Sequence, residues 1–216
     1  MRDMVLILNF DDACTRAIAR GLRAEHVYCK IVPGNIALEE MRAQQPLGVI
    51  LSGGVTGGVP GGMDMGLLQE GYPLLAMGDT AAMLCRALGG DAQETAICNS
   101  IGGVAFARCT LTEGLDDCER MLHNVRRLRL PPGAQVLAES QRETVGYMLS
   151  ERNLYAVQFT LEQNDTDGMR LLLNFVLSVC GCTRWGDYEA FVGRAEEEIR
   201  RVVGEGRAVC AMTGGL

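Results

Sequence analysis

Short apolar runs alternate with amphipathic segments through most of the chain. Each run is the length of a buried strand, and such strands are typical of parallel sheets covered on both faces. The runs that we expect to form strands are residues 4–8, 27–32, 47–51, 73–77 and 154–159. The segments that we expect to form helices are residues 14–24, 37–44, 79–88 and 168–179. Strands and helices that alternate with short connections predict a parallel α/β sheet.

The middle of the chain, residues 96–148, has a different pattern. Its apolar runs are shorter and alternate with polar positions, as in residues 104–107, 134–137 and 145–148. Alternation of this kind indicates half-buried strands in antiparallel hairpins. We therefore predict a three-layer α/β sandwich with a mostly parallel central sheet and an antiparallel hairpin region beside it.

After residue 184 the pattern changes again. Apolar residues at steps of three or four predict a charged amphipathic helix over residues 187–203, and Gly204 ends it. Residues 207–212 read as a new strand that leads into Thr213-Gly214-Gly215-Leu216. We expect a first domain over residues 1–184. We expect residues 185–216 to be a linker helix and the first strand of a further domain that the chain truncates.

Composition and charge narrow the class of protein. The chain has 216 residues, 48% of them apolar, which is enough for one sizeable core, and its net charge is −7. Lys and Arg do not cluster as a phosphate-binding surface requires, so we expect no nucleic acid partner. No apolar run approaches the roughly 20 residues that span a bilayer, and the N-terminus has no signal-peptide pattern, so we expect a cytoplasmic protein.

Cysteine usage points to free thiols. There are nine cysteines, an odd number scattered through apolar segments, which argues against a disulfide framework. The pair in Cys180-Gly181-Cys182 lacks the two-residue spacer of common zinc sites. We therefore expect no metal site in this chain.

Short motifs along the whole chain carry a resemblance to a known family. They are Asn9-Phe10 with Thr15, Val27-Tyr28-Cys29, Leu51-Ser52-Gly53-Gly54, Leu88-Gly89-Gly90, Val157-Gln158-Phe159 with Glu162, Asn174-Phe175 with Cys180-Gly181-Cys182, and Thr213-Gly214-Gly215-Leu216. In their order and spacing they resemble class I glutamine amidotransferases, specifically the GMP synthase branch. The resemblance implies the flavodoxin-like sandwich of that family. The last motif is similar to the start of a phosphate-binding loop in an ATP-pyrophosphatase domain.

The resemblance also implies where the chemistry would lie. In that family a sharp strand-to-helix turn presents a cysteine nucleophile, a histidine activates it, and a glutamate two residues later orients the histidine. Here these positions hold Gly78, Thr160 and Glu162. Glycine has no side chain to attack with, and threonine is no base at neutral pH. Only the glutamate is kept, so we predict a vestigial site that does not hydrolyse glutamine.

The neighbouring oxyanion loop is implied at Gly53, Gly54 and Asp79. Glycine at residue 78 relieves the backbone strain of such a turn, and we expect Asp79 to be the N-cap of the following helix. A carboxylate that faced the pocket would repel a developing negative charge. Asp79 and Glu162 could instead form a carboxylate pair, a reading that we rank well below the vestigial one.

Other side chains offer weaker candidates. Cys85 is the nearest thiol to Gly78, but its apolar neighbours favour a buried structural thiol. Of the two histidines, we expect His26 at the surface, whereas His123 matches a family histidine among neighbours that depart from the family pattern. Residues 99–103 have lost the charged and aromatic pattern of a glutamine-binding segment.

Three hypotheses follow from the sequence. The leading one is a scaffold domain of a GMP synthase-like protein, which by resemblance would aminate XMP to GMP with ATP, Mg²⁺ and free ammonia. ATP and Mg²⁺ would be bound by an ATP-pyrophosphatase domain, joined in cis or in trans, and this chain would hold no cofactor. The sequence leaves open whether the chain forms a homodimer. The alternative is a non-catalytic binding or interaction module. The third is a repurposed enzyme that uses Cys85 or Asp79.

Overall fold

The computed structural model describes residues 3–10, 12–53, 62–95, 100–122, 125–160, 165–185 and 188–210. The chain divides into two compact units, residues 1–184 and 185–216.

The first unit is built on a nine-stranded mixed sheet. Its strands, in sheet order, are β2 (Cys29–Pro33), β1 (Val5–Asn9), β3 (Gly48–Ser52), β4 (Leu74–Met77), β11 (Leu154–Val157), β10 (Glu143–Leu149), β9 (Gln135–Ser140), β6 (Ser100–Phe106) and β7 (Cys118–Leu122). The first five strands are parallel, and the last four join antiparallel. The parallel strands lie where the continuous apolar runs predicted them, because both faces of those strands are buried.

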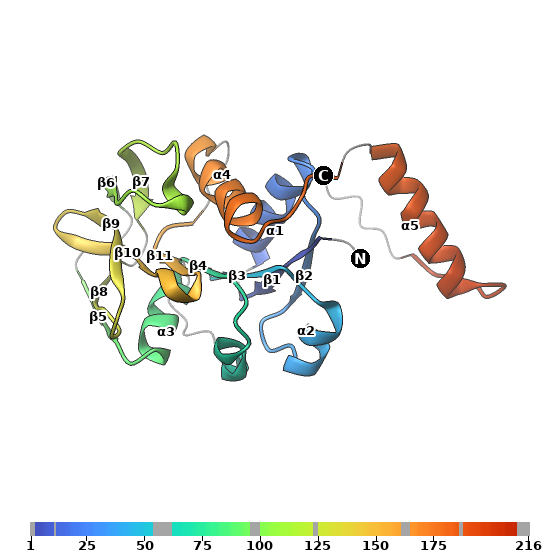
Figure 1. The fold of residues 1–216 in the computed structure, drawn as a ribbon, viewed down its shortest axis with the longest axis horizontal. Coiled ribbons are helices and arrows are strands. Elements are labelled where there is room, and N and C mark those ends of the chain that lie inside the picture. The colour runs from blue at the N-terminus through green and yellow to red at the C-terminus, as the bar shows by residue number, and fades with distance from the viewer. Residues whose placement is uncertain are drawn as a thin grey trace. The chain divides into compact units, whose positions relative to one another are not determined.

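Helices cover both faces of the parallel part. They are α1 (Asp12–Ala24), α2 (Leu38–Gln44), α3 (Asp79–Ala87) and α4 (Thr166–Leu173), and α4 continues as a π-helical segment, Asn174–Val179. Figure 1 shows α1 and α4 on one face of the sheet and α2 and α3 on the other. Alternate residues of β1 enter the two cores, with Ile7 in the α1/α4 core and Leu6 in the α2/α3 core. The predicted three-layer α/β sandwich is confirmed.

A second sheet of two antiparallel strands, β5 (Asp91–Glu94) and β8 (Arg126–Arg129), follows α3. The sequence did not predict β5, β7 or β8, because they contain few apolar residues and alternate only weakly. Short 3₁₀ turns connect other elements at Met65–Gln69, Thr110–Thr112 and Ser150–Arg152.

The second unit contains α5 (Tyr188–Val203), the predicted amphipathic helix. Its side chains Ile199 and Val202 are exposed. Residues 207–210 form no strand, in contrast to the prediction for residues 207–212, since the described part of this unit offers no neighbouring strand to pair with. Thr213-Gly214-Gly215-Leu216 lies outside the described residues.

None of the helices in the described ranges is long and apolar enough to cross a membrane.

Candidate functional site

The turn between β4 and α3 is the centre of the candidate site. Its single residue, Gly78, has φ 68° and ψ −137°, a conformation that glycine adopts freely and other residues rarely do. Gly78 is also the N-cap of α3, so the expectation that Asp79 would be the N-cap is wrong: Asp79 is already the first helical residue. The Gly78 amide donates to the Val157 carbonyl at 2.9 Å, and the Gly78 carbonyl accepts from the Ala81 amide at 3.0 Å. The turn is therefore tied both to β11 and to the first turn of α3.

The end of β3 lies directly against this turn. The Gly53 amide donates to the Met77 carbonyl at 3.1 Å. A Cβ on Gly53 would lie 2.8 Å from the Thr80 amide nitrogen and 3.4 Å from that of Asp79. Only glycine fits at residue 53 without moving the start of α3.

The same approach leaves no room for a side chain at Gly78. A Cβ on Gly78 would overlap the carbonyl oxygen of Gly53 and would lie 3.0 Å from Cγ2 of Thr160. The structure thus brings together Gly53, Gly78 and Thr160, three positions that the family resemblance singled out. The space that the first carbon of a nucleophilic side chain needs is occupied by backbone.

Thr80 fixes the start of α3 beneath the turn. Its fully buried hydroxyl lies 2.7 Å from the Met77 carbonyl oxygen and 2.9 Å from the Leu51 carbonyl oxygen, and it accepts the Met77 amide at 3.0 Å. One hydroxyl therefore joins the ends of β3 and β4 to α3. This network holds the glycine contact in place.

The other predicted site residues are distributed as follows. Gly54, Glu162 and His123 lie outside the described residues, and His26 is exposed. Cys85 is fully buried, and its thiol lies 3.5 Å from the carbonyl oxygens of Asp91 and Arg129. Burial raises the pKa of this thiol. A buried thiol with a raised pKa is a poor nucleophile, which supports the structural role expected for it.

An ionic group that the sequence did not reveal lies against Phe159, the residue before Thr160. The guanidinium of Arg120, on β7, stacks 5.4 Å from the ring centre of Phe159 and forms an ion pair with Asp165. Asp165 also caps α4 by accepting the Gly168 amide at 2.8 Å. Arg120 and Asp165 are both at least nine-tenths buried. An arginine in a short polar strand gives no sequence signal of burial, because its partner lies far along the chain.

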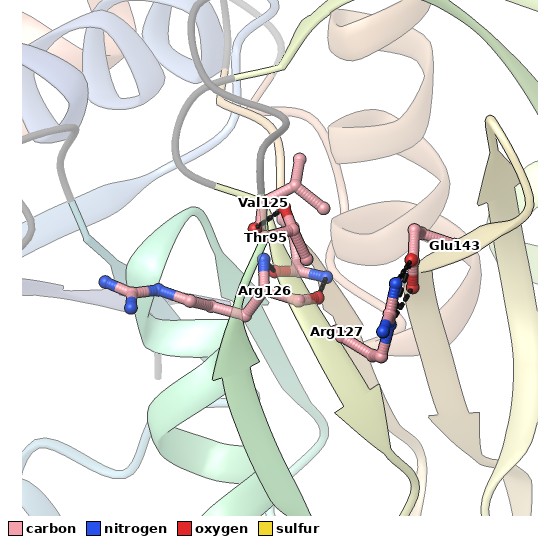
Figure 2. Close-up of polar contacts among 6 residues, drawn as sticks. Thr95, Val125, Arg126, Arg127 and Glu143 are labelled. Carbon is pink, nitrogen blue, oxygen red and sulfur yellow. Dashed lines mark hydrogen bonds and ion pairs between the residues drawn. The ribbon is translucent and has the colours of Figure 1, made fainter.

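Gln158 attaches the small sheet to the large one. Its side-chain oxygen accepts the Arg126 amide at 2.7 Å, and its side-chain nitrogen donates to the carbonyls of Arg126 and Thr144, both at 2.9 Å. Figure 2 shows Arg126 between the hydrogen bond from Thr95 to the Val125 carbonyl and the pairing of Arg127 with Glu143.

The strand that we predicted over residues 154–159 is shorter in the structure, since β11 ends at Val157. The next two residues have other roles: Gln158 joins the sheets, and Phe159 packs in the core beneath Arg120.

The fold and the site agree with comparisons to known proteins. The model of the family "Glutamine amidotransferase class-I" matches residues 6–179. The chain therefore belongs to the class I glutamine amidotransferases, as the resemblance predicted.

Within that family the chain is homologous to the amidotransferase domain of GMP synthase. The glutamine-hydrolyzing GMP synthase of Clostridium botulinum (strain Alaska E43 / Type E3) is 32% identical over 225 residues, which cover 100% of this chain and 44% of the relative. That of Allorhizobium ampelinum is 34% identical over 228 residues, with 99% and 44% covered. The chain spans less than half the length of these relatives.

Solved structures show the same fold. A Thermoplasma acidophilum protein described as a GMP synthase subunit superposes with a TM-score of 0.72 at 20% identity and covers 93% of this chain and 98% of its own. A glutamine amidotransferase from Thermotoga maritima superposes with a TM-score of 0.58 at 16% identity and covers 94% of each chain. These likenesses extend over the first unit's layered architecture.

Proposed function

We propose that this chain is an amidotransferase domain of the GMP synthase type that has lost glutamine hydrolysis and acts as a scaffold. The observation that carries the proposal is that the Gly53 carbonyl leaves no room for a side chain on Gly78, the residue to which the family resemblance assigns the nucleophile. Thr160 stands where the activating base belongs. Both halves of the nucleophile–base pair are missing, and acyl transfer by this route requires both.

The partner is a synthetase domain of the ATP-pyrophosphatase type, in cis or in trans. We propose that this partner aminates XMP to GMP in the cytoplasm and takes free ammonia instead of nitrogen released from glutamine. ATP and Mg²⁺ would be held by the partner. In this chain, the described residues contain no group of three His, Cys, Asp or Glu side chains arranged to hold a metal ion.

The test is a comparison of nitrogen sources for the natural full-length protein, or for this chain together with its separately expressed synthetase. We expect GMP to form from XMP and ATP with ammonium chloride and not with glutamine. Addition of an unrelated glutaminase to the glutamine reaction should restore GMP formation, which controls for an inactive synthetase. Glutamine-driven turnover above background without that addition would overturn the proposal.

The same proteins distinguish the scaffold role from the alternative, a non-catalytic binding or interaction module. It is favoured if neither nitrogen source gives GMP while the chain still binds the synthetase or a small molecule. Thermal unfolding of the chain with glutamine, glutamate, nucleotides or the synthetase would show this as a raised midpoint without turnover. Buried polar atoms without a partner among the described residues, such as the Ser140 hydroxyl oxygen, favour this alternative.

A further inference from the structure

A wide groove lies between α1 and α4, which Figure 1 shows side by side on one face of the sheet. The two helices approach each other most closely at Gly21, where an added Cβ would lie 2.5 Å from the sulfur of Met169. The groove has a volume of about 1100 Å³. It is lined by residues of α1, by residues of α4 and its π-helical continuation, and by Arg184.

Both walls of the groove present small or apolar side chains at helical spacing. They are Ala17, Gly21 and Ala24 on α1, and Met169, Leu173 and Leu177 on the other wall. Ala17 and Ala24 are exposed, and the three larger side chains are half-buried, so apolar surface on both walls reaches solvent. A row of small residues beside a row of large ones leaves room for the apolar side chains of a third helix. Because each row extends over about two turns, the groove suits a helix better than a compact small molecule.

The π-helical wall of the groove is held in place by a side chain. Asn174, at the start of the π-helical segment, donates from its side-chain nitrogen to the Leu111 carbonyl at 2.9 Å and to the Glu113 carbonyl at 2.8 Å. These hydrogen bonds tie the wall to the 3₁₀ turn Thr110–Thr112 and the residue that follows it. A groove with fixed walls loses little conformational freedom when a partner binds.

The charges along the groove are not balanced. The carboxylate of Glu25 pairs with Arg184 at 3.0 Å, and Asp165 forms the buried ion pair described above. Arg20 and Arg170 also line the groove, are exposed, and have no hydrogen bond or ion pair among the described residues. The lining therefore carries two uncompensated positive charges in a chain whose net charge is −7. This arrangement favours a partner with carboxylates beside its apolar face.

We propose that the groove between α1 and α4 binds an acidic amphipathic helix of a partner protein. The apolar face of that helix packs between the two walls, and its glutamates or aspartates pair with Arg20 and Arg170. Burial of apolar surface supplies most of the affinity, whereas the exposed ion pairs mainly select an acidic partner and fix its orientation. The groove uses none of the residues around Gly78, so the proposal does not depend on the loss of glutamine hydrolysis.

The test measures binding of two synthetic peptides to the whole chain by fluorescence anisotropy. Both peptides carry leucines at helical spacing on one face, and the remaining positions hold glutamate and alanine in one peptide and lysine and alanine in the other. Arg20→Glu/Arg170→Glu reverses the two free charges of the groove. The matched control is Arg108→Glu/Arg142→Glu, which changes two exposed arginines outside the groove lining by the same charge.

We expect the acidic peptide to bind and the basic one not to bind. The groove variant should bind the acidic peptide about tenfold more weakly, because attraction at two positions becomes repulsion, and the control should bind it as the parent chain does. Added salt should weaken binding to the parent chain, because exposed charge pairs are screened.

A second pair of variants tests the shape of the groove without a change in charge. Ala17→Phe places a ring in the groove at an exposed position of α1. Ala43→Phe adds the same ring at an exposed position of α2, on the other face of the sheet, and is the control. We expect weaker binding of the acidic peptide only in Ala17→Phe.

The proposal would be overturned by the absence of binding, by equal binding of the acidic and basic peptides, or by equal binding in each variant and its control. Self-association of the parent chain that Arg20→Glu/Arg170→Glu abolishes would assign the groove to a second copy of this chain and would overturn the proposal as well. Unfolding midpoints establish that the variants are folded. If the arginine variant is not, the alanine pair decides.

Discussion

The carbonyl oxygen of Gly53 lies closer than van der Waals contact to the position that the Cβ of any side chain on Gly78 would take. The two glycines therefore depend on each other: the turn after β4 and the end of β3 approach this closely because neither residue has a side chain. Restoration of a nucleophile at residue 78 would require the end of β3 to move. Thr80 resists that movement, because its hydroxyl joins the ends of both strands.

Introduction of a cysteine at residue 78 and a histidine at residue 160 should not give glutaminase activity. We expect the Gly78→Cys/Thr160→His double variant to release no ammonia from glutamine above background. The variant should also lose about 1–3 kcal/mol of unfolding free energy, because cysteine would adopt a left-handed φ and meet the Gly53 carbonyl. A coupled ammonia assay and urea denaturation measure the two effects. Gly103→Ala serves as the stability control, and measurable glutaminase activity would contradict the predicted obstruction.

Removal of the Thr80 hydroxyl should destabilise the first unit. Thr80→Val keeps the shape of the side chain but leaves the buried Met77 amide and Leu51 carbonyl without this partner. The cost of such unpaired groups is about 1–3 kcal/mol. Urea denaturation followed by circular dichroism checks it. An unchanged midpoint would mean that the backbone at the turn is held by other contacts.

Gln158 should contribute far more to the free energy of unfolding than an exposed glutamine does. Gln158→Met removes two hydrogen bonds to Arg126 on the small sheet and one to Thr144 on β10, which corresponds to about 2–4 kcal/mol at the usual value per bond. We also expect faster hydrogen exchange at the Arg126 amide, which donates to this side chain. The matched control is Gln135→Met on β9, where the side chain is exposed. Equal effects of the two substitutions would rule out the bridging role.

Acid should weaken the fold partly through Glu143. Hydrogen bonds from Arg127 hold the pKa of the Glu143 carboxyl below its ordinary value of 4.5. A carboxyl with a lowered pKa stabilises the folded state fully above its unfolded pKa, and this contribution is lost as the pH falls through the folded pKa. Urea midpoints of the parent chain should therefore drop below about pH 4.5, and Glu143→Gln should reduce that slope. A slope that is identical in the variant would show that the pair contributes nothing.

Thiol labelling separates buried from accessible cysteines. Burial raises the pKa of Cys85 and that of Cys182, the latter to about 12, whereas Cys210 is exposed. With iodoacetamide at neutral pH and peptide mass spectrometry, we expect Cys210 to be labelled first in the native chain. Cys85 and Cys182 should be labelled only in urea. Rapid native labelling of Cys85 would instead support the hypothesis of a repurposed enzyme.

The parallel half of the fold could be predicted because its signal is local. A strand buried on both faces must be a continuous apolar run, as in Leu74–Met77, and the turn glycine follows directly. The polar strands Asp91–Glu94 and Arg126–Arg129 could not be predicted this way. They pair with each other, and Gln158 holds them, so their stability comes from contacts between distant segments.

The same distinction applies to the site. The absence of a thiol at Gly78 is visible in the sequence, but the obstruction by Gly53 depends on how closely two strands approach. The burial of Arg120 was missed for a similar reason. A charged residue is buried only when a partner such as Asp165 compensates it, and no local pattern shows that partner.

β2, an outer strand of the large sheet, is poorly suited to pair with a further strand. β2 carries an exposed Lys30 and ends at Pro33, which has no amide hydrogen to donate. Charge and proline on an edge oppose the addition of another strand. Growth of the sheet by docking of a second molecule along β2 is therefore disfavoured, which protects the protein against edge-to-edge aggregation on that side.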